Sequence, residues 1–435
     1  MPEAIVGMTH GDSEPHECNA VIVSPEIGIF DFLAAGDILT QISELEIKSN
    51  ITIADAKKMA LGETKDIRQD VLATLDVIGH INGEVTRSLQ PIMPGTPLFE
   101  ATPEQITKFL GFDLTDNMIH IGELLRRSDV PVVIARDWFL KHISIMGMTG
   151  AGKSNLAKVI LDALKSWYND TIIIVDPHGE YEGEQVRVDD ILGDTKDLDF
   201  ELVVERAFEI IGKKDKDFRY LIEIAYASST IRNKKLSKVD ALLEACNDYY
   251  VRGASSYKSI MLEAIKTETI IQTVQGKIIK HDKKKPLVFD LRGVKHEVGE
   301  SVVNIIAELV LELGKTGRSI ITVIDEVQLY CNQRKKSLSK EAIINLISEG
   351  RKFGCGVVIM SQRPAKVDKD IISQCNTKFC LQVTNENDIR QVRSSTEYAT
   401  RDMFREVQKL QCGQALLSSP WLKRPVFVSI REYIG

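Results

Sequence analysis

The sequence predicts an α/β protein in which a parallel sheet, covered by helices on both faces, follows a β-rich N-terminal region. From residue 142 onwards, uninterrupted apolar runs recur, and longer stretches with helical character separate them. The first 135 residues instead hold short apolar runs between turn signals such as Ile81-Asn82-Gly83 and Met93-Pro94-Gly95. Apolar strands without alternation that are separated by helices are typical of a parallel sheet buried on both faces.

The N-terminal region, residues 1–135, is predicted to form a separate small β-barrel domain. Short strands such as Ala20–Val23 and Val132–Ile134, spaced by turns, are typical of a small barrel or sandwich. The segment IADAKKMALG, residues 53–62, has helical character and interrupts the strands.

The remaining chain divides into a core and an insertion. Core strands are expected at 142–146, 171–175, 286–290, 319–324 and 356–360, with a helix at 154–167. No strand pattern occurs between 200 and 280, where charged amphipathic segments predict a helical insertion. We therefore predict a nucleotide-binding core over 136–199 and 281–418, an insertion over 200–280, and a C-terminal strand and tail over 419–435.

Composition limits the class of protein. The chain has 435 residues, 43% of them apolar and 27% charged, which is ordinary for a globular protein with two or three domains. With a net charge of −7, the average surface repels nucleic acid, so any DNA-binding basic residues must be gathered in one place. Seven cysteines without a CxxC pair fit a reducing interior better than a zinc ribbon or a disulfide framework. Without a signal peptide or an apolar run of membrane-spanning length, we expect a cytoplasmic protein that does not enter the membrane.

A phosphate-binding loop is predicted where GMTGAGKS, Gly147 to Ser154, matches G-x-x-x-x-G-K-[ST] between an apolar strand and a helix. The backbone N–H groups of such a turn and the N-terminus of its helix bind a triphosphate. Lys153 would reach the β- and γ-phosphates of ATP, and Ser154 would bind Mg²⁺. A glycine-rich turn without a ligand is the alternative, which the flanking strand and helix disfavour. The predicted nucleotide-binding residues are Gly147, Gly150, Ala151, Gly152, Lys153, Ser154 and Asn155.

An acidic pair, Asp325-Glu326, follows the apolar run Ile320–Ile324. Asp325 is predicted to contact the Mg²⁺ shell, and Glu326 to act as the general base that activates water. The alternative is that both residues merely begin a helix. The pair favours hydrolysis over phosphoryl transfer to a small molecule, which would need only the metal ligand.

A third strand end carries DPHGEY, residues 176–181. Ligands of open α/β sheets bind outside the carboxyl ends of the strands, so this turn should face the nucleotide. We favour Glu180 over His178 as a functional residue. The alternative is a tight turn whose polar groups bond to one another.

The two ends of the strand GVVIM, residues 356–360, carry further candidates. The helix expected over 341–352 stops at Gly354, so Arg351 lies in its last turn. In a monomer this arginine would simply suit the helix dipole. In a ring it would reach the nucleotide of a neighbour, where such arginines accelerate phosphoryl transfer roughly 10³–10⁵-fold. At the other end, Gln362 could sense the γ-phosphate and orient water, and Arg363 is a second basic candidate.

The motifs MGMTGAGKSN, VDPHGEY, VIDEVQ, SEGRKFGCGVVIMSQRPAKVDKDIISQCNTK and TNENDIRQVRSS, in this order, resemble the HerA family of the HerA/FtsK ATPases. The resemblance runs from about Val132 to the C-terminus and implies a RecA-like P-loop ATPase core. It further implies a homo-hexameric ring that moves double-stranded DNA, commonly with a NurA-type nuclease in end resection, or with other effectors in phage defence.

By this resemblance the catalytic residues are Glu326, the trans-acting Arg351 and the sensor Gln362. Lys153-Ser154 corresponds to Walker A, and Asp325-Glu326 to Walker B. One departure is Lys141-His142, where many relatives have Arg-His. A lysine lacks the planar fork of an arginine, so the match does not assign Lys141 a role at the interface.

Contacts to DNA are predicted only from charge. Of the basic loops, Arg334-Lys335-Lys336 is favoured for the pore because it follows the acidic pair and could move with hydrolysis, although such runs are often solvated faces. The other candidates are 212–216, 232–235 and 283–285.

Two other function classes stay open. The ring could be a scaffold that uses ATP to assemble and to activate a nuclease or another effector, or a secretion-type ATPase, whose relatives often carry a membrane anchor that is absent here. ABC-type, SMC-type and GTPase functions are disfavoured, since neither an LSGGQ-like signature nor an N-K-x-D motif occurs. No nuclease site is evident, so cutting would need a partner.

Overall fold

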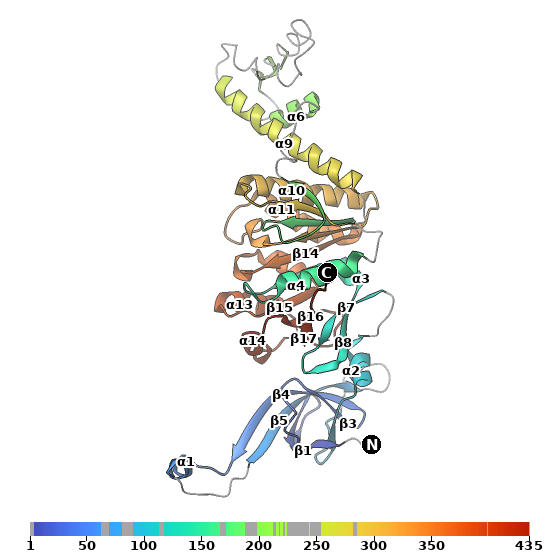
Figure 1. The fold of residues 1–435 in the computed structure, drawn as a ribbon, viewed down its shortest axis with the longest axis vertical. Coiled ribbons are helices and arrows are strands. Elements are labelled where there is room, and N and C mark those ends of the chain that lie inside the picture. Colours follow the sequence, from blue (N-terminus) through green and yellow to red (C-terminus); the bar gives the residue numbers. More distant parts are fainter. Residues whose placement is uncertain are drawn as a thin grey trace. The chain divides into compact units, whose positions relative to one another are not determined.

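The chain forms two compact units in the computed structural model (Figure 1). The structure describes residues 4–61, 69–80, 90–112, 117–165, 171–187, 198–211, 254–281, 285–397 and 399–434, and also 215–216, 218–220, 222–223 and 243. The first unit combines residues 1–135 with 398–410 and 414–431. The second combines 136–397 with 411–413 and 432–435.

The first unit contains a closed six-stranded barrel, which confirms the predicted N-terminal β-barrel. Its order is β1-β2-β5-β4-β3-β6, and every neighbouring pair is antiparallel. Side chains of Leu33, Ile42, Leu75 and Leu98 are fully buried in its interior. Closure leaves no free strand edge, as expected for a small barrel. The strands are β1 (Ile5–Ser13), β2 (Glu17–Ile22), β3 (Phe32–Ala35), β4 (Ile38–Ser49), β5 (Gln69–His80) and β6 (Pro97–Glu100).

Four further antiparallel strands, which belong to the 11-stranded sheet of the chain, complete this unit. Strand β7 (Met118–Leu124) pairs with β8 (Arg127–Ala135) and with β17 (Val426–Ile430), which pairs in turn with β16 (Gln414–Ser418). The run Val132–Ile134 therefore lies outside the barrel, in β8. The helices of the unit are α1 (Ile53–Ala60), at the segment predicted to be helical, α2 (Pro103–Leu110) and α14 (Arg401–Val407).

The second unit is built on seven parallel strands in the order β11-β12-β10-β13-β14-β9-β15. Except in the edge strand β11, every residue of these strands is buried, which explains the apolar runs without alternation. The strands are β9 (Ile143–Met146), β10 (Thr171–Asp176), β11 (Glu184–Arg187), β12 (Leu287–Asp290), β13 (Ile320–Ile324), β14 (Cys355–Ser361) and β15 (Thr377–Leu381). The sequence did not predict β11 or β15.

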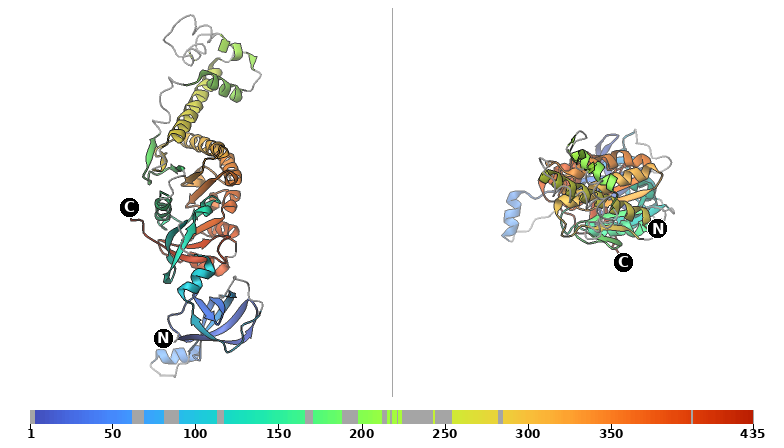
Figure 2. Two further views of the ribbon diagram at one scale, coloured as in Figure 1. Left: turned by 90° about the vertical axis from the view of Figure 1, so that its right-hand side faces the viewer. Right: turned by 90° about the horizontal axis from the view of Figure 1, so that it is seen from above.

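Helices cover both faces of this sheet (Figure 2). Helices α10 (His296–Lys315) and α11 (Leu338–Gly350) pack on each other and on β14. Helix α4 (Lys153–Lys165) connects β9 to β10 in the opposite direction along the sheet, so a right-handed crossover places it on the other face. The shorter helices are α3 (Arg136–Phe139), α12 (Lys369–Gln374) and α13 (Glu386–Ser395).

Two helices are described in the predicted insertion. Helix α6 (Phe200–Ile211) packs against the 27-residue α9 (Ala254–Lys280) through buried Val203, Ala207 and Met261. The basic loops predicted at 212–216, 232–235 and 283–285 fall wholly or mostly outside the described residues. Within the described part of the chain, every helix is too short or too polar to cross a membrane.

Candidate functional site

The phosphate-binding loop connects β9 to α4 and depends on its glycines. Gly150 and Gly152 have φ values of 79° and 101°, which side-chain-bearing residues rarely adopt. A Cβ at Gly152 would lie 2.9 Å from the Gly413 backbone nitrogen, and a Cβ at Gly147 would lie 2.8 Å from Cβ of Leu381. The loop therefore has the left-handed turns and the close backbone packing that its sequence motif predicts.

Lys153 begins α4 and is 8% exposed. Its Nζ donates a hydrogen bond of 3.1 Å to the carbonyl oxygen of Met148, within the same loop. Burial lowers the pKa of this ammonium, and the carboxylates of Glu326, Asp325 and Glu180 oppose that shift. A buried cation facing three carboxylates is suited to bind phosphate oxygens together with a divalent cation.

The acidic pair follows β13 at the same edge of the sheet. Asp325 and Glu326 are each 4% exposed, and the backbone N–H of Glu326 donates to Oδ1 of Asp325 over 2.8 Å. Burial, followed by the nearby Glu326 charge, raises the pKa of Asp325 to about 7. Glu326 has φ 49° and ψ 45°, a left-handed conformation that costs about 1–3 kcal/mol and tends to occur at functional sites. The fold thus holds two carboxyl groups close together in a buried position.

Two side-chain amides hold the Glu326 carboxylate. Nε2 of Gln362 donates to Oε1 over 2.5 Å, and Nε2 of Gln328 donates to Oε2. The Thr149 hydroxyl of the phosphate loop donates to Gln362, and Ser361 Oγ donates to Gln328 over 2.6 Å. A hydrogen-bond chain therefore connects the phosphate loop to the predicted general base. The sequence predicted Gln362 but not Thr149, Gln328 or Ser361, although all three lie inside recognised motifs.

The turn after β10 shows both interpretations considered for it. The fully buried Asp176 carboxylate accepts backbone N–H groups of His178, Gly179 and Tyr181 over 2.6–3.1 Å, so it shapes the turn. Glu180 instead extends to the phosphate loop, where it accepts a hydrogen bond of 2.6 Å from Ser154 Oγ. The structure thus brings Glu180 to the site, as favoured from the sequence.

The donor set fits a magnesium ion that keeps several non-protein ligands. No group of three or more His, Cys, Asp or Glu side chains arranged to hold a metal occurs in the described residues. Mg²⁺ in nucleotide sites takes only one or two protein oxygens, with water and phosphate completing its shell. Ser154 Oγ and the Asp325 carboxylate could supply these oxygens, and the hydrogen bond from Ser154 to Glu180 shows that the hydroxyl already meets a negative oxygen.

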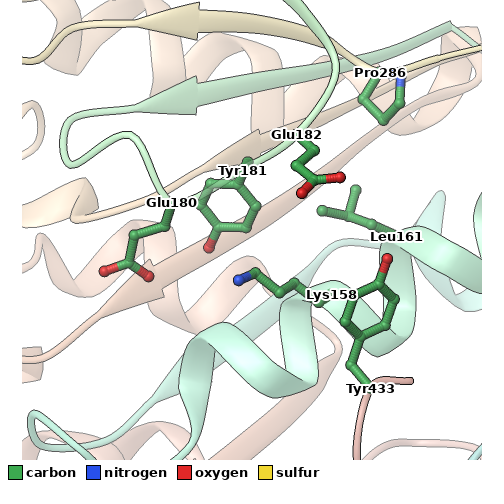
Figure 3. A pocket seen from close by; sticks show the side chains of 7 residues that line it. All are labelled: Lys158, Leu161, Glu180, Tyr181, Glu182, Pro286 and Tyr433. Atoms are coloured by element: carbon green, nitrogen blue, oxygen red, sulfur yellow. The ribbon is translucent and has the colours of Figure 1, made fainter. Parts of the chain in front are cut away.

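A pocket lies on the flank of α4 (Figure 3). Glu180, Tyr181 and Glu182 line one side, and Lys158 and Tyr433 face them from the other. The C-terminal residues reach this flank because the Tyr433 backbone N–H donates to Oδ1 of Asn155 over 2.9 Å. Asn155, predicted to contact nucleotide, is thus also tied to the C-terminal tail.

Arg351 lies at the opposite edge of the sheet, the amino edge, where the parallel strands begin. The phosphate loop and the acidic pair lie at the carboxyl edge, where these strands end. It stands exposed in a 3₁₀ turn between α11 and β14, and Gly354 ends the turn with φ 72°. The seven residues of β14, roughly 23 Å of extended chain, separate this edge from Gln362. Arg351 therefore cannot contact the phosphate loop of its own chain.

The other basic candidates occupy separate positions. Arg363 lies at the carboxyl edge, with Nε 3.8 Å from Oδ2 of Asp388. Arg334, Lys335 and Lys336 are exposed in the loop after β13. Lys141 precedes β9 at the amino edge, away from the nucleotide loop of its own chain.

Comparison with known proteins confirms the resemblance predicted from the motifs. The model of the central domain of helicase HerA matches residues 119–310, and that of the zonular occludens toxin matches 264–411. A probable helicase of Methanocaldococcus jannaschii is 26% identical over 91% of this chain and 80% of its own length. The DNA double-strand break repair helicase HerA of Pyrococcus furiosus is 24% identical over 89% of this chain and 82% of its own.

Solved structures similar to this chain include VirB4 of Thermoanaerobacter pseudethanolicus and the conjugative coupling protein TrwB. VirB4 has a TM-score of 0.48 and 15% identity, over 74% of this chain and 98% of VirB4. TrwB has a TM-score of 0.48 and 13% identity, over 77% of this chain and 92% of TrwB.

Proposed function

We propose that this protein is an ATP hydrolase that moves double-stranded DNA through a homo-hexameric ring. The proposal starts from its relation to the HerA helicases and from its RecA-like P-loop core. The observation that carries the proposal is the division of the site between two edges of one sheet. Lys153, Asp325 and Glu326 meet at the carboxyl edge, whereas Arg351 lies at the amino edge, out of reach of its own phosphate loop.

The residues of the carboxyl edge support hydrolysis of a nucleoside triphosphate. The glycine-rich loop and the Lys153 ammonium would bind the phosphates, and Glu326 would take a proton from the attacking water. Gln362 and Gln328 support this role because both donate to the Glu326 carboxylate and so set its direction. When bound, Mg²⁺ would be held by Ser154 and Asp325 and would neutralise charge on the phosphate oxygens.

A ring explains the position of Arg351. If the amino edge of one copy faces the carboxyl edge of the next, each Arg351 meets the phosphates bound by its neighbour. The guanidinium would then stabilise the charge that develops on the transferring phosphoryl group. On this proposal the site is complete only between two copies, and oligomerisation is required for activity.

Double-stranded DNA is the proposed substrate in the cytoplasm, with a NurA-type nuclease or another effector as the proposed partner. The names of the relatives support a role in double-strand break repair. The alternative role in phage defence rests on the family resemblance alone. The basic loop 334–336 is the proposed DNA contact of the described residues because it is exposed and follows the acidic pair.

The ATPase rate with and without linear duplex DNA, at two salt concentrations, tests the proposal on protein sized in the same buffer. We expect a ring-sized species whose rate rises with duplex and loses that rise at higher salt, since phosphate contacts release counterions. Removing Arg334, Lys335 and Lys336 together should reduce the stimulation, whereas removing Lys48, Lys57 and Lys58 of the first unit should not. A rate that ignores DNA would favour the ring scaffold.

Mixed rings test the shared site directly. Lys153→Ala and Arg351→Ala proteins should each be inactive, and an equal mixture should recover part of the activity, because some interfaces then combine an intact Lys153 with an intact Arg351. If both variants assemble but the mixture stays inactive, the shared site is wrong.

A further inference from the structure

A buried histidine at the amino edge of the sheet has no part in the proposed chemistry. His142 is 2% exposed and immediately precedes β9. Its φ of 64° is left-handed, a conformation shared among the non-glycine residues of the described chain only with Phe30, Arg126 and Glu326. A buried polar side chain on a disfavoured backbone persists only where the surroundings fix it.

His142 ties three strands together. Its Nδ1 accepts a hydrogen bond of 3.1 Å from the backbone N–H of Val357 in β14. Its own carbonyl oxygen accepts from Thr377 N–H of β15 over 3.2 Å, and its N–H donates to Phe139 over 3.2 Å. Because Nδ1 accepts, the proton of the neutral ring is on Nε2. Burial lowers the pKa of the ring to about 4, so it is neutral near pH 7.

The other side of the ring faces the end of α11. Nε2 is buried and makes no hydrogen bond of normal geometry within the described residues, although the Ile347 carbonyl is near enough to favour a proton on the ring. The charge of Arg351 is also near enough to disfavour that proton. The ring thus lies between the first residues of β14 and the turn that carries Arg351.

The amino end of β14 is held closely from a second direction. A Cβ at Gly356 would lie 2.5 Å from the carbonyl oxygen of Phe139, in the turn just before His142. Backbone of β14 and of that turn therefore touch with no room for a side chain. Any shift of His142 must move the start of β14, and Arg351 precedes β14 by only four residues.

We propose that His142 is a positioning residue for Arg351. It fixes the amino end of β14 and so sets where the arginine projects. Because β9 runs from His142 directly to the phosphate loop, the same residue links the nucleotide site of one copy to the arginine that this copy offers to its neighbour. The inference rests on the proposed shared site.

Two substitutions of His142 separate the role of its imidazole ring from the role of its left-handed backbone. In His142→Gly the left-handed φ is unstrained but the acceptor for Val357 is lost. In His142→Asn a side-chain oxygen can still accept, and asparagine tolerates a positive φ. Since a misplacement of about 1 Å can lower a rate by two orders of magnitude, we expect His142→Gly to lower the ATPase rate of uniform rings about tenfold or more. His142→Asn should stay within about threefold of the unaltered protein.

Mixed rings show whether the defect acts through Arg351. His142→Gly subunits keep an intact phosphate loop, so they should recover activity with Lys153→Ala subunits, which supply a well-placed Arg351. They should not recover activity with Arg351→Ala subunits. A general structural defect would also damage the phosphate loop, so the first mixture would show no recovery above the His142→Gly protein alone.

A second variant keeps the test informative if His142→Gly does not assemble. Gly356→Ala leaves His142 in place but forces β14 away from Phe139, so it should show the same pattern of recovery as Arg351→Ala. The inference is overturned if His142→Gly has full activity, if His142→Asn is as impaired as His142→Gly, or if neither His142→Gly nor Gly356→Ala recovers with Lys153→Ala. If Lys153→Ala and Arg351→Ala themselves fail to recover, the proposed function falls first.

Discussion

The two edges of the parallel sheet in the second unit differ in the charged groups that they carry: acids predominate at the carboxyl edge, and an exposed arginine lies at the amino edge. At the carboxyl edge, the carboxyl groups of Glu326, Asp325 and Glu180 all act on the buried Lys153 ammonium, so three acids share one buried cation. At the amino edge, Arg351 stands exposed and far from every phosphate-binding group of its own chain. On the proposed function, the cation that the carboxyl edge of one copy needs is the one that the amino edge of its neighbour presents.

The strand β14 connects these two edges. It begins four residues after Arg351 and ends one residue before Gln362, and it lies between the strands of the acidic pair and of the phosphate loop. A displacement of this strand along its axis would move the arginine and the glutamine together. The strand is completely buried, so on the proposed function it would couple the nucleotide site of its own copy to that of the neighbouring copy.

The largest expected effect comes from the amino edge. Arg351→Ala should lower the ATPase rate by about 10³-fold or more while leaving nucleotide affinity within a few-fold, because the guanidinium acts on charge that develops in the transition state. The ATPase rate of Arg351→Lys should be almost as low as that of Arg351→Ala, since an ammonium lacks the planar fork of a guanidinium. Single-turnover rates and nucleotide titrations separate the two quantities.

Arg363 is the matched control at the carboxyl edge. Its side chain is turned toward Asp388, so Arg363→Ala should reduce the ATPase rate far less than Arg351→Ala. If the two substitutions were equally damaging, or their order were reversed, the assignment of the trans-acting arginine to the amino edge would be wrong.

At the carboxyl edge, Glu326→Gln should lower hydrolysis by about 10²–10⁴-fold, since an amide cannot take a proton from water. ATP binding should persist, because Lys153 and the glycine-rich loop are unchanged. Phosphate release and nucleotide binding are the two measurements. If the protein is instead a scaffold that only needs ATP to assemble, Glu326→Gln would still support its partner nuclease.

The sequence predicts the carboxyl edge better than the amino edge, and the reason is physical. The residues proposed to bind and hydrolyse ATP follow strand ends directly, so Lys153, Asp325 and Gln362 are visible as short motifs beside apolar runs. The contact between His142 and Val357 joins residues 215 positions apart, and no local pattern encodes it. The strand β15 was missed because five buried residues after a short helix resemble the end of that helix.

The amino edge should also be distinguishable by pH. The pKa of His142 is lowered from 6.5 to about 4, by burial first and by the Arg351 charge as a lesser cause. The unfolded chain therefore binds a proton that the folded chain refuses as pH falls below 6.5. From pH 7 to pH 5 the free energy of unfolding should fall by about 2 kcal/mol through this group.

Other groups titrate over the same range, so the comparison must be between variants. Urea unfolding at pH 7 and pH 5 should show a smaller loss for His142→Asn than for the unaltered protein, by about 2 kcal/mol. Equal losses in both proteins would mean that His142 is protonated in the fold and that its ring is not held neutral between β14 and α11.

The smallest expected effect distinguishes the two amides that donate to Glu326, the proposed general base. Gln328→Leu removes the donor to one Glu326 oxygen while Gln362 keeps the other, so the ATPase rate should fall about tenfold, as expected for one hydrogen bond to a charged group. Gln374→Leu, at the end of α12, is the matched control and should leave the rate unchanged.

Combining Gln328→Leu with Thr149→Val tests whether the hydrogen-bond chain from the phosphate loop acts as a unit. If it does, the double variant loses less than the product of the two single losses, because each change loosens the same Glu326 carboxylate. Full additivity would instead mean that the two donors act on separate steps. The hydrogen-bond chain from the phosphate loop would then not affect hydrolysis through Glu326.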